Sequence, residues 1–299
     1  MKAFLARADP LKLINGRALA NQTLEQLAQR VRDLQPRALH KPSLAYVMVG
    51  DNADSQAYVR IKTRACRRLG IAVVPNHFPG SVSAAEVLHC IDSLNKDETV
   101  HGLLVQLPLP KHLDTTTVLD AVWPSKDLDC LSSTNFGKLS MRGSQPAFWP
   151  CTPQGCMELL DHAGISVAGK HAVVVGRSNL AGRPLAAMLQ QANATVTLCH
   201  AYTPNLRQYT RQADILCVAA GIPDLITADM VKEKAVVLDI GINVTPTGLV
   251  GDVDFDGLLE KVAAITPVPG GVGPMTVAML LTNLVSAWEK RIPSEHTRA

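Results

Sequence analysis

The chain has 299 residues, of which 47% are hydrophobic and 18% are charged, and its formal net charge is +3. This length and apolar content exclude a disordered or fibrous chain and predict two domains, or one large one. Because the positive charge is small and dispersed, neither a nucleic acid nor an anionic membrane is an expected partner, and we expect small-molecule ligands.

The cysteines and the apolar runs indicate a cytoplasmic protein. The seven cysteines form no Cys-x-x-Cys pair and lack interleaved histidines, so we predict reduced thiols and no metal site. Charged residues and a proline break the apolar run in residues 1–13, so we expect no signal peptide. The apolar stretch 275–288 is interrupted by polar residues and is shorter than the ~18 residues of a membrane span.

The first part of the chain alternates helical periodicity with β-branched apolar runs. This order is typical of a parallel sheet covered by crossover helices. We predict a first helix over residues 17–34 and strands over 44–49, 71–74 and 100–107. The intervening helices are predicted over 53–69 and 83–94.

A loop-rich segment, residues 124–150, is the expected crossing into a second domain. Thr152 and Pro153 then predict a helix start, as N-cap and first helical residue. The strand and helix alternation resumes, with strands predicted over residues 171–175, 194–199, 215–219 and 236–240 and a final helix over 275–290.

The predicted fold is therefore two α/β domains that flank a cleft. The C-terminal domain is expected to be a Rossmann-like doubly wound parallel sheet. The final helix comes after this second sheet has ended, so we expect it to pack back on the first domain. The predicted boundaries are 1–150 plus 275–299 for one domain and 151–274 for the other.

A glycine-containing turn follows the strand at residues 171–175. Gly176 permits a tight turn at the strand end, and Gly182 allows the next helix to approach closely while backbone N–H groups face a pyrophosphate. Ser178 stands where G-x-G-x-x-G has its middle glycine, so the motif is incomplete. A plain strand-turn-helix explains this segment equally well.

Two neighbouring features favour NADP over NAD. The next strand ends in Cys199-His200-Ala201, without the acidic residue that holds a ribose 2′-hydroxyl in NAD enzymes. Arg177 lies where a guanidinium could bind a 2′-phosphate. The alternative is that Arg177 is a solvent-exposed residue at the sheet edge.

Ser55, Tyr58 and Lys62 are spaced three and four residues apart, which places them on one face of the helix predicted over 53–69. An apolar stripe beside them would pack on the sheet, so this polar face is expected at the edge of the core. A lysine there loses part of its hydration and becomes a candidate general base. Taken alone, the helix is better explained by an ordinary lysine whose stem is covered by Tyr58.

Two further polar residues follow predicted strand or loop ends. Gln106 ends the strand at 100–107, at the carboxyl edge where ligands of open α/β sheets bind. Its amide could hold a lysine amine or a substrate carbonyl. Asp129 lies in the crossing loop and could accept hydrogen bonds from a substrate ring, although such a residue is more often a solvated carboxylate.

Residues 265–276, ITPVPGGVGPMT, combine three prolines and three glycines before Met275. The prolines fix the chain path, and the glycines permit close approach and positive φ. Such a rigid loop with few side chains suits contact with a flat ligand. Its candidate ligand-binding residues are Pro269, Gly270, Gly271 and Gly273.

Together these segments resemble the bifunctional methylenetetrahydrofolate dehydrogenase and methenyltetrahydrofolate cyclohydrolase family, the FolD family. The resemblance extends from Ile14-Asn15-Gly16 to the final helix. Its most specific motifs are Tyr58-Val59 with Lys62, residues 105–110 (VQLPLP), Gly176-Arg177-Ser178 and the proline-glycine loop.

The resemblance implies roles for the candidate residues. Lys62 would be the cyclohydrolase lysine and Gln106 its partner, Asp129 would bind the pterin, and Tyr58 would pack on the folate beside Ser55. The loop 269–273 would line the folate site. The implied NADP-binding residues are Gly176, Arg177, Ser178, Gly182, His200 and Ile242, with segments 239–243 and 251–253 bordering the cofactor.

The sequence departs from the family pattern at three places. Cys130 replaces the usual glycine after the pterin aspartate, which puts the backbone of that loop in question. Ala201 replaces a frequent serine after Cys-His, which leaves Arg177 with more of the phosphate contact. Ala53-Asp54 replaces the usual Pro-Ala at a helix start.

The implied function is NADP-dependent oxidation of 5,10-methylenetetrahydrofolate to 5,10-methenyltetrahydrofolate, followed by hydrolysis to 10-formyltetrahydrofolate. The family also implies a homodimer. Three alternatives stay open: a monofunctional dehydrogenase, another two-domain NADP oxidoreductase of the shikimate dehydrogenase type, and a non-catalytic binding or regulatory relative.

Overall fold

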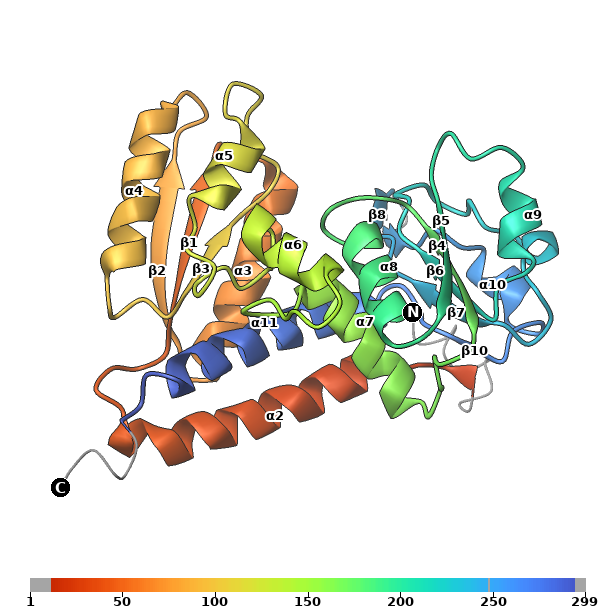
Figure 1. Cartoon of the computed structure of the whole chain (residues 1–299), viewed down its shortest axis with the longest axis horizontal. Helices are drawn as coiled ribbons and strands as arrows, with labels where there is room; N and C mark the ends of the chain where they lie inside the picture. The colour runs from red at the N-terminus through yellow and green to blue at the C-terminus, as the bar shows by residue number, and fades with distance from the viewer. Residues whose placement is uncertain (1–11, 247, 294–299) are drawn as a thin grey trace. The chain divides into compact units, whose positions relative to one another are not determined.

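A computed structural model describes residues 12–246 and 248–293 (Figure 1). The chain divides into two compact units. Of the described residues, 21–151 and 277–293 form what is called here the first unit, and 12–20, 152–246 and 248–276 form the second unit. Residues 1–11, which carry most of the stretch considered for a signal peptide, lie outside the described residues.

The first unit contains a three-stranded parallel sheet in the order β2-β1-β3. The strands are β1 (Ser43–Val49), β2 (Ala72–Phe78) and β3 (Gly102–Val105). Every residue of the central β1 except Tyr46 is buried, as the continuous apolar run predicts. The strand predicted over 100–107 is shorter at both ends, because His101 and Gln106 flank β3.

Helices connect and cover this sheet (Figure 1). Asn52 caps α3 and Ser83 forms a capping box with Glu86 at the start of α4, so both helices begin where the sequence predicts. Val87 and Ile91 of α4 pack with Val47 and Leu103 in the core. The helices of this part of the chain are α2 (Gly16–Leu34), η2 (Gln35–Arg37), α3 (Ala53–Arg68), α4 (Ala84–Lys96), α5 (Thr115–Asp120), α6 (Ser133–Ser140) and α11 (Val272–Glu289).

The C-terminal part of α11 groups with the first unit. The Asn283 side chain donates hydrogen bonds to the carbonyls of Leu128 and Trp149, at 2.9 and 2.8 Å. The indole of Trp288, which is 1% exposed, donates to the carbonyl of His40 at 2.8 Å. These bonds satisfy carbonyls of segments that precede the helix by more than a hundred residues.

The second unit contains a five-stranded parallel sheet in the order β10-β7-β6-β4-β5. β4 pairs with β5 on one side and β6 on the other, so the chain reverses direction across the sheet at β4. This is the topological switch point of a doubly wound fold. The strands are β4 (His171–Val175), β5 (Thr195–Cys199), β6 (Ile215–Val218), β7 (Val236–Asp239) and β10 (Ala264–Ile265).

Helices and a hairpin complete the second unit. They are α7 (Cys151–His162), α8 (Gly182–Gln191), α9 (Leu206–Thr210), η3 (Ala228–Met230), α10 (Phe255–Leu258) and the antiparallel pair β8 (Asn243–Thr245) and β9 (Gly248–Val250). Strands β6 and β7 are buried throughout, which matches their unbroken apolar sequences.

The prediction of two α/β domains with parallel sheets is confirmed. Some details of the prediction were wrong. The helix α7 begins at Cys151, so Thr152 is not its N-cap; its hydroxyl instead lies 3.0 Å from that of Thr276. Residues 124–150 were expected to be loop but contain α6, which Ser132 caps.

The start of the described chain also differs from the expected boundary, since residues 12–20 group with the second unit. Leu13 forms a bridge with Ile265, and the Ile14 N–H donates to the Ile265 carbonyl at 2.9 Å. The start of the described chain thus extends the edge strand β10, a long-range pairing that no local pattern encodes. Of the helices in the described part of the chain, none has both the length and the apolarity to cross a membrane.

Candidate functional site

The candidate residues of helix α3 are held at its N-terminal half. The Asn52 side chain accepts from the Ser55 N–H at 2.9 Å, which caps the helix. Ser55 is buried, and its hydroxyl donates to the Leu107 carbonyl at 3.3 Å. Tyr58 is 39% exposed, and burial, then the charge of Asp54, raises the pKa of its phenol. The aromatic ring is therefore available to a ligand.

Lys62 and Gln106 meet as the sequence predicts. The Lys62 ammonium donates to the Gln106 side-chain oxygen at 3.5 Å. The Gln106 amide nitrogen donates to the Leu107 carbonyl at 2.7 Å, and its backbone N–H donates to Val47 at 2.8 Å. Because the amide NH₂ is engaged, its oxygen is the atom presented to the lysine. The pair lies at the carboxyl end of β3, the edge where parallel sheets bind ligands.

The loop that carries Asp129 is organised by its neighbour Asp127. The Asp127 carboxylate accepts hydrogen bonds from the backbone of Leu131 and Ser132 and from the Asn135 side chain, at 2.9 to 3.0 Å. Asp127 is thus a structural residue, whereas Asp129 is half-buried and accepts none of these hydrogen bonds. Cys130 adopts φ 57°, so this loop retains a left-handed backbone conformation that a glycine adopts more readily.

Cys151 is a neighbour of the site that the sequence did not reveal. Its thiol is fully buried and donates to the Leu128 carbonyl at 3.3 Å. Burial and then the Asp129 carboxylate raise its pKa well above the ordinary value, while the charge of Lys62 acts in the opposite direction. The charges of both Asp129 and Lys62 therefore act on this one thiol, so both groups lie near Cys151.

In the second unit, two glycines shape the turn between β4 and α8. Gly176 has φ 111°, and a Cβ on it would overlap the Ala219 carbonyl at the end of β6. A Cβ on Gly182 would overlap the Gly176 carbonyl. The Ser178 hydroxyl accepts from the Ala181 N–H at 3.2 Å and so stabilises the turn. The backbone itself forms this surface, at the switch point of the sheet.

Arg177 and His200 extend the site along the carboxyl ends of β4 and β5. The exposed Arg177 guanidinium lies 5.9 Å from the centre of the Tyr202 ring. The Tyr202 N–H donates to His200 Nδ1 at 3.2 Å, which leaves the ring proton of a neutral His200 on Nε2. The two side chains can therefore offer a charged and a neutral donor to an anion.

Two buried carboxylates hold the loop after β6. The Asp252 carboxylate accepts from the N–H groups of Ala220, Gly221 and Ile222, at 2.6 to 3.0 Å. The Asp239 carboxylate accepts from the backbone of Asp252 at 2.9 Å. Burial and the charge of Asp252 raise the pKa of Asp239 to about 7. These residues fix main-chain groups beside the Gly176 turn.

The proline-glycine loop is close-packed, as expected. Gly270 has φ 117°, and a Cβ on Gly271 would lie 2.6 Å from the Pro267 carbonyl oxygen. A Cβ on Gly273 would meet only the Ile242 side chain, at 3.6 Å, so close approach does not require glycine there. Ile242 is 40% exposed. Gly273 and Ile242 are therefore neighbours, although the sequence placed them in separate ligand sites.

The described residues at the switch point offer groups that fit a dinucleotide. Residues 12–246 and 248–293 contain no group of three or more His, Cys, Asp or Glu side chains that could hold a metal ion. The glycine turn at the switch point offers backbone N–H groups for a pyrophosphate, and Arg177 with His200 offers donors for a further phosphate.

Comparisons with known proteins agree with these features. Residues 14–129 match the family described as "Tetrahydrofolate dehydrogenase/cyclohydrolase, catalytic domain". Residues 150–292 match "Tetrahydrofolate dehydrogenase/cyclohydrolase, NAD(P)-binding domain". A bifunctional protein FolD from a Polaromonas species is 49% identical over 280 residues, which cover 93% of this chain and 99% of that protein.

Two solved structures are similar throughout. Bifunctional FolD from Campylobacter jejuni has a TM-score of 0.89 and 45% identity, covering 93% of this chain and 99% of that one. FolD from Trypanosoma brucei, complexed with NADP cofactor and inhibitor, has a TM-score of 0.90 and 38% identity, covering 96% and 98%. On the family matches and these identities, the chain belongs to the tetrahydrofolate dehydrogenase/cyclohydrolase family.

Proposed function

We propose that the protein oxidises 5,10-methylenetetrahydrofolate to 5,10-methenyltetrahydrofolate with NADP, and hydrolyses the product to 10-formyltetrahydrofolate. Family membership and the relatives' printed activities support both steps. The observation that carries the proposal is the contact between Lys62 and Gln106 at the carboxyl end of β3. A dehydrogenase alone has no need of this pair, so the contact favours a bifunctional enzyme over a monofunctional dehydrogenase.

Hydrolysis requires a group that moves protons. Water adds to the carbon between two nitrogens, and one carbon–nitrogen bond then breaks, so protons must leave the water and reach the departing nitrogen. We assign this transfer to the Lys62 Nζ. Gln106 holds that nitrogen through an oxygen which cannot take its proton, so Gln106 orients the lysine without competing with it.

Binding of the folate is assigned to residues of the first unit and to one loop of the second unit. The half-buried Asp129 offers a hydrogen-bond acceptor to the pterin, and the Tyr58 ring offers an apolar face. Ser55 holds the Leu107 carbonyl and so supports the segment after Gln106. Residues Pro269, Gly270, Gly271 and Gly273 are proposed as further folate contacts, because a loop with so few side chains admits a flat ligand.

Dehydrogenation requires orientation rather than proton transfer. The cation left on the methenyl carbon is delocalised over two nitrogens, so no protein acid or base is needed. The chemistry that NADP supplies when bound is the acceptance of a hydride. Gly176, Ser178 and Gly182 shape its turn, Arg177 and His200 are proposed to bind a phosphate, and Ile242 is proposed as an apolar contact.

The experiment is a two-stage assay on one preparation. With methylenetetrahydrofolate and NADP, absorbance should show NADPH forming, followed by decay of the methenyl signal faster than its uncatalysed hydrolysis. NADPH formation without faster methenyl decay would leave only the dehydrogenase. Failure of both reactions with bound ligands would favour a non-catalytic relative.

We also propose that the protein is a cytoplasmic homodimer. All seven cysteines are free in the structure, as a reducing compartment maintains them. The homodimer is an expectation from the family resemblance. Light scattering on the purified chain tests the dimer, and fractionation of the source cells tests the location.

A further inference from the structure

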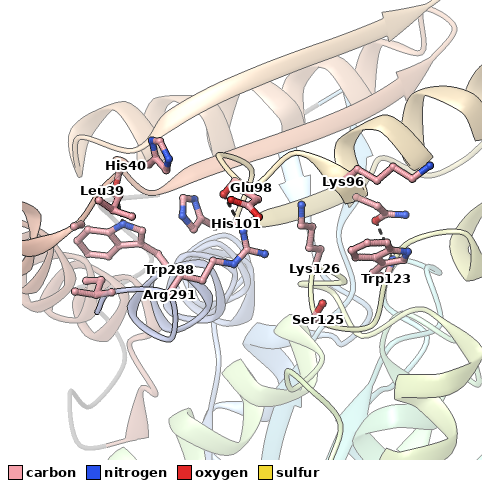
Figure 2. Close-up of a pocket in the computed structure, with 13 residues that line it drawn as sticks. Leu39, His40, Lys96, Glu98, His101, Trp123, Ser125, Lys126, Trp288 and Arg291 are labelled. Atoms are coloured by element: carbon pink, nitrogen blue, oxygen red, sulfur yellow. Dashed lines mark hydrogen bonds between the residues drawn. The ribbon is translucent and has the colours of Figure 1, made fainter. Parts of the chain in front are cut away.

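A cavity of about 560 Å³ lies in the first unit (Figure 2), and neither Lys62 nor Gln106 lines it. Its wall includes His101, which directly precedes β3, whereas Gln106 directly follows that strand. The two positions are five residue steps apart along the strand, which is about 16 Å at about 3.3 Å per residue. The cavity is therefore at the amino edge of the sheet, and the proposed catalytic residues are at the carboxyl edge.

Basic groups dominate the polar part of this wall. Lys96, Lys126 and Arg291 are cationic, and the carboxylate of Glu98 is the acidic group that lines the cavity with them. Lys96 is paired with Asp92 at 2.6 Å, outside the cavity lining. Of the described residues, no carboxylate lies within salt-bridge distance of Lys126 or Arg291.

Neutral carbonyls hold these two cations in place. The Lys126 ammonium, on a residue that is 2% exposed, donates to the Leu94 and Asp97 carbonyls at 2.8 and 2.7 Å. Arg291 Nη1 donates to the Glu98 and Val100 carbonyls at 3.0 and 3.2 Å. Carbonyls at the end of α4 stabilise a cation but do not cancel its charge. The wall thus keeps fixed positive charge.

The charged and titratable groups of this wall shift one another's pKa values. Burial and then the charges of Arg291 and His40 lower the pKa of His101 to about 4, so its imidazole is neutral at pH 7. Burial and the charge of Arg291 lower the pKa of Lys126 to about 8, against the opposing charges of Asp97 and Glu98. His101 is 2% exposed, and its Nδ1 has no hydrogen-bond partner among the described residues. A buried ring nitrogen without a partner marks a polar network that is incomplete in the free protein.

The rest of the wall is apolar and aromatic. Trp123 is 47% exposed and Leu39 is 76% exposed, and the indole of Trp288 lines the cavity from α11. Figure 2 shows Trp288 and Arg291 near His40 and His101, and Trp123 near Lys96. The cavity is within the usual range for small-molecule sites, about 300 to 1,000 Å³. An aromatic wall beside fixed cations suits a ligand that has a flat apolar part and an anionic group.

We propose that this cavity binds a small organic anion, in which a phosphate or carboxylate group is joined to a flat apolar ring. Arg291 and Lys126 supply the charge that holds the anionic group, and Trp123 contacts the ring. The site is separate from those of the folate and NADP, so it does not depend on the proposed function.

The test uses the full-length protein and isothermal titration calorimetry. The probes are phenyl phosphate, inorganic phosphate and phenol, which separate the anionic group from the ring. We expect saturable binding of phenyl phosphate, at least about tenfold weaker binding of inorganic phosphate, and no saturable binding of phenol. Saturating NADP should leave phenyl phosphate binding unchanged, since the probe could otherwise occupy a nucleotide site.

Two variants and a matched control locate the site. Arg291→Gln should weaken phenyl phosphate binding at least about tenfold, whereas Arg142→Gln, which removes an exposed charge from the same unit, should not change it. Trp123→Leu should reduce the advantage of phenyl phosphate over inorganic phosphate and serves if Arg291→Gln does not fold. Circular dichroism and thermal unfolding report folding of each variant. No binding to the wild type, equal binding by both Gln variants, or competition by NADP would overturn the proposal.

Discussion

The candidate site of the first unit is built from side chains, whereas that of the second unit is built mainly from the backbone. In the first unit, long side chains form the site, and Lys62 donates a hydrogen bond of 3.5 Å to Gln106. In the second unit, the backbone forms the surface, since a Cβ on Gly176 or Gly182 would overlap a carbonyl group. Hydrolysis needs a proton carrier, whereas dehydrogenation needs a bound and oriented cofactor. The difference predicts that substitutions in the two units separate the two activities.

The largest expected effect is at the proton carrier. Lys62→Met should slow methenyl hydrolysis by about 10²- to 10⁴-fold, the usual contribution of general acid–base catalysis. NADPH formation should continue, because that step uses no protein acid or base. Decay of the methenyl absorbance and NADPH formation measure the two steps.

Lys138→Met is the matched control, because Lys138 is an exposed lysine of the same unit. It should leave both rates unchanged. Hydrolysis at the wild-type rate in Lys62→Met would remove Lys62 from the mechanism.

The next effect is at the backbone turn. Gly176→Ala should destabilise the protein by about 2 kcal/mol or more and weaken NADP binding, because the residue has φ 111° and its Cβ would overlap the Ala219 carbonyl. Chemical denaturation and NADP titration measure both effects.

Gly164→Ala separates the strain of positive φ from the overlap of a Cβ with a neighbouring carbonyl. Gly164 also has positive φ, at 67°, but a Cβ there would meet no atom within 4 Å. We expect this control to cost only about 1 kcal/mol and to leave NADP binding intact. Equal effects of the two alanine substitutions would show that the close approach of β4 and β6 is not required.

Arg177 tests the choice of cofactor. Arg177→Gln should weaken NADP binding by about 10- to 100-fold and leave NAD binding unchanged, because a charge-assisted bond to the additional phosphate is lost. Arg211→Gln, an exposed substitution in the same unit, should change neither affinity. Equal turnover with NAD and NADP in the wild type would contradict the role given to Arg177.

The smallest expected effect is a pH dependence in the second unit. The pKa of Asp239 is raised to about 7 in the folded protein, from 3.8. The folded state therefore holds a proton that the unfolded state releases between about pH 4 and 7, so this residue makes stability fall as the pH rises through that range.

The wild type and Asp239→Asn are compared by denaturation at pH 5 and pH 7. The difference between their free energies of unfolding should change by about 1 kcal/mol or more, in the direction that favours the wild type at the lower pH. A constant difference would show that Asp239 does not titrate in this range. His101, whose pKa is lowered to about 4, makes stability rise with pH instead. Because both proteins contain His101, its contribution cancels in this comparison.

The sequence alone determined many of the strands and helices and the grouping of several candidate residues. The strand at residues 171–175 was predicted with its exact bounds, because a buried parallel strand is an unbroken apolar run between turn residues. Ser55, Tyr58 and Lys62 were placed on one helical face from their spacing, and Gln106 was placed at a strand end by the prolines that follow. These features depend on periodicity and on local stereochemistry, which neighbouring residues encode.

Tertiary structure decided which distant groups meet. Only the folded chain brings Cys151 to Asp129, pairs the Ile14 N–H with Ile265, and seats the Asp252 carboxylate on the N–H groups of the loop after β6. It also separates Asp127, which organises its loop, from Asp129, although both are aspartates of one short motif. Burial and hydrogen-bond partners arise from contacts between residues far apart along the chain, and these set the role of each side chain.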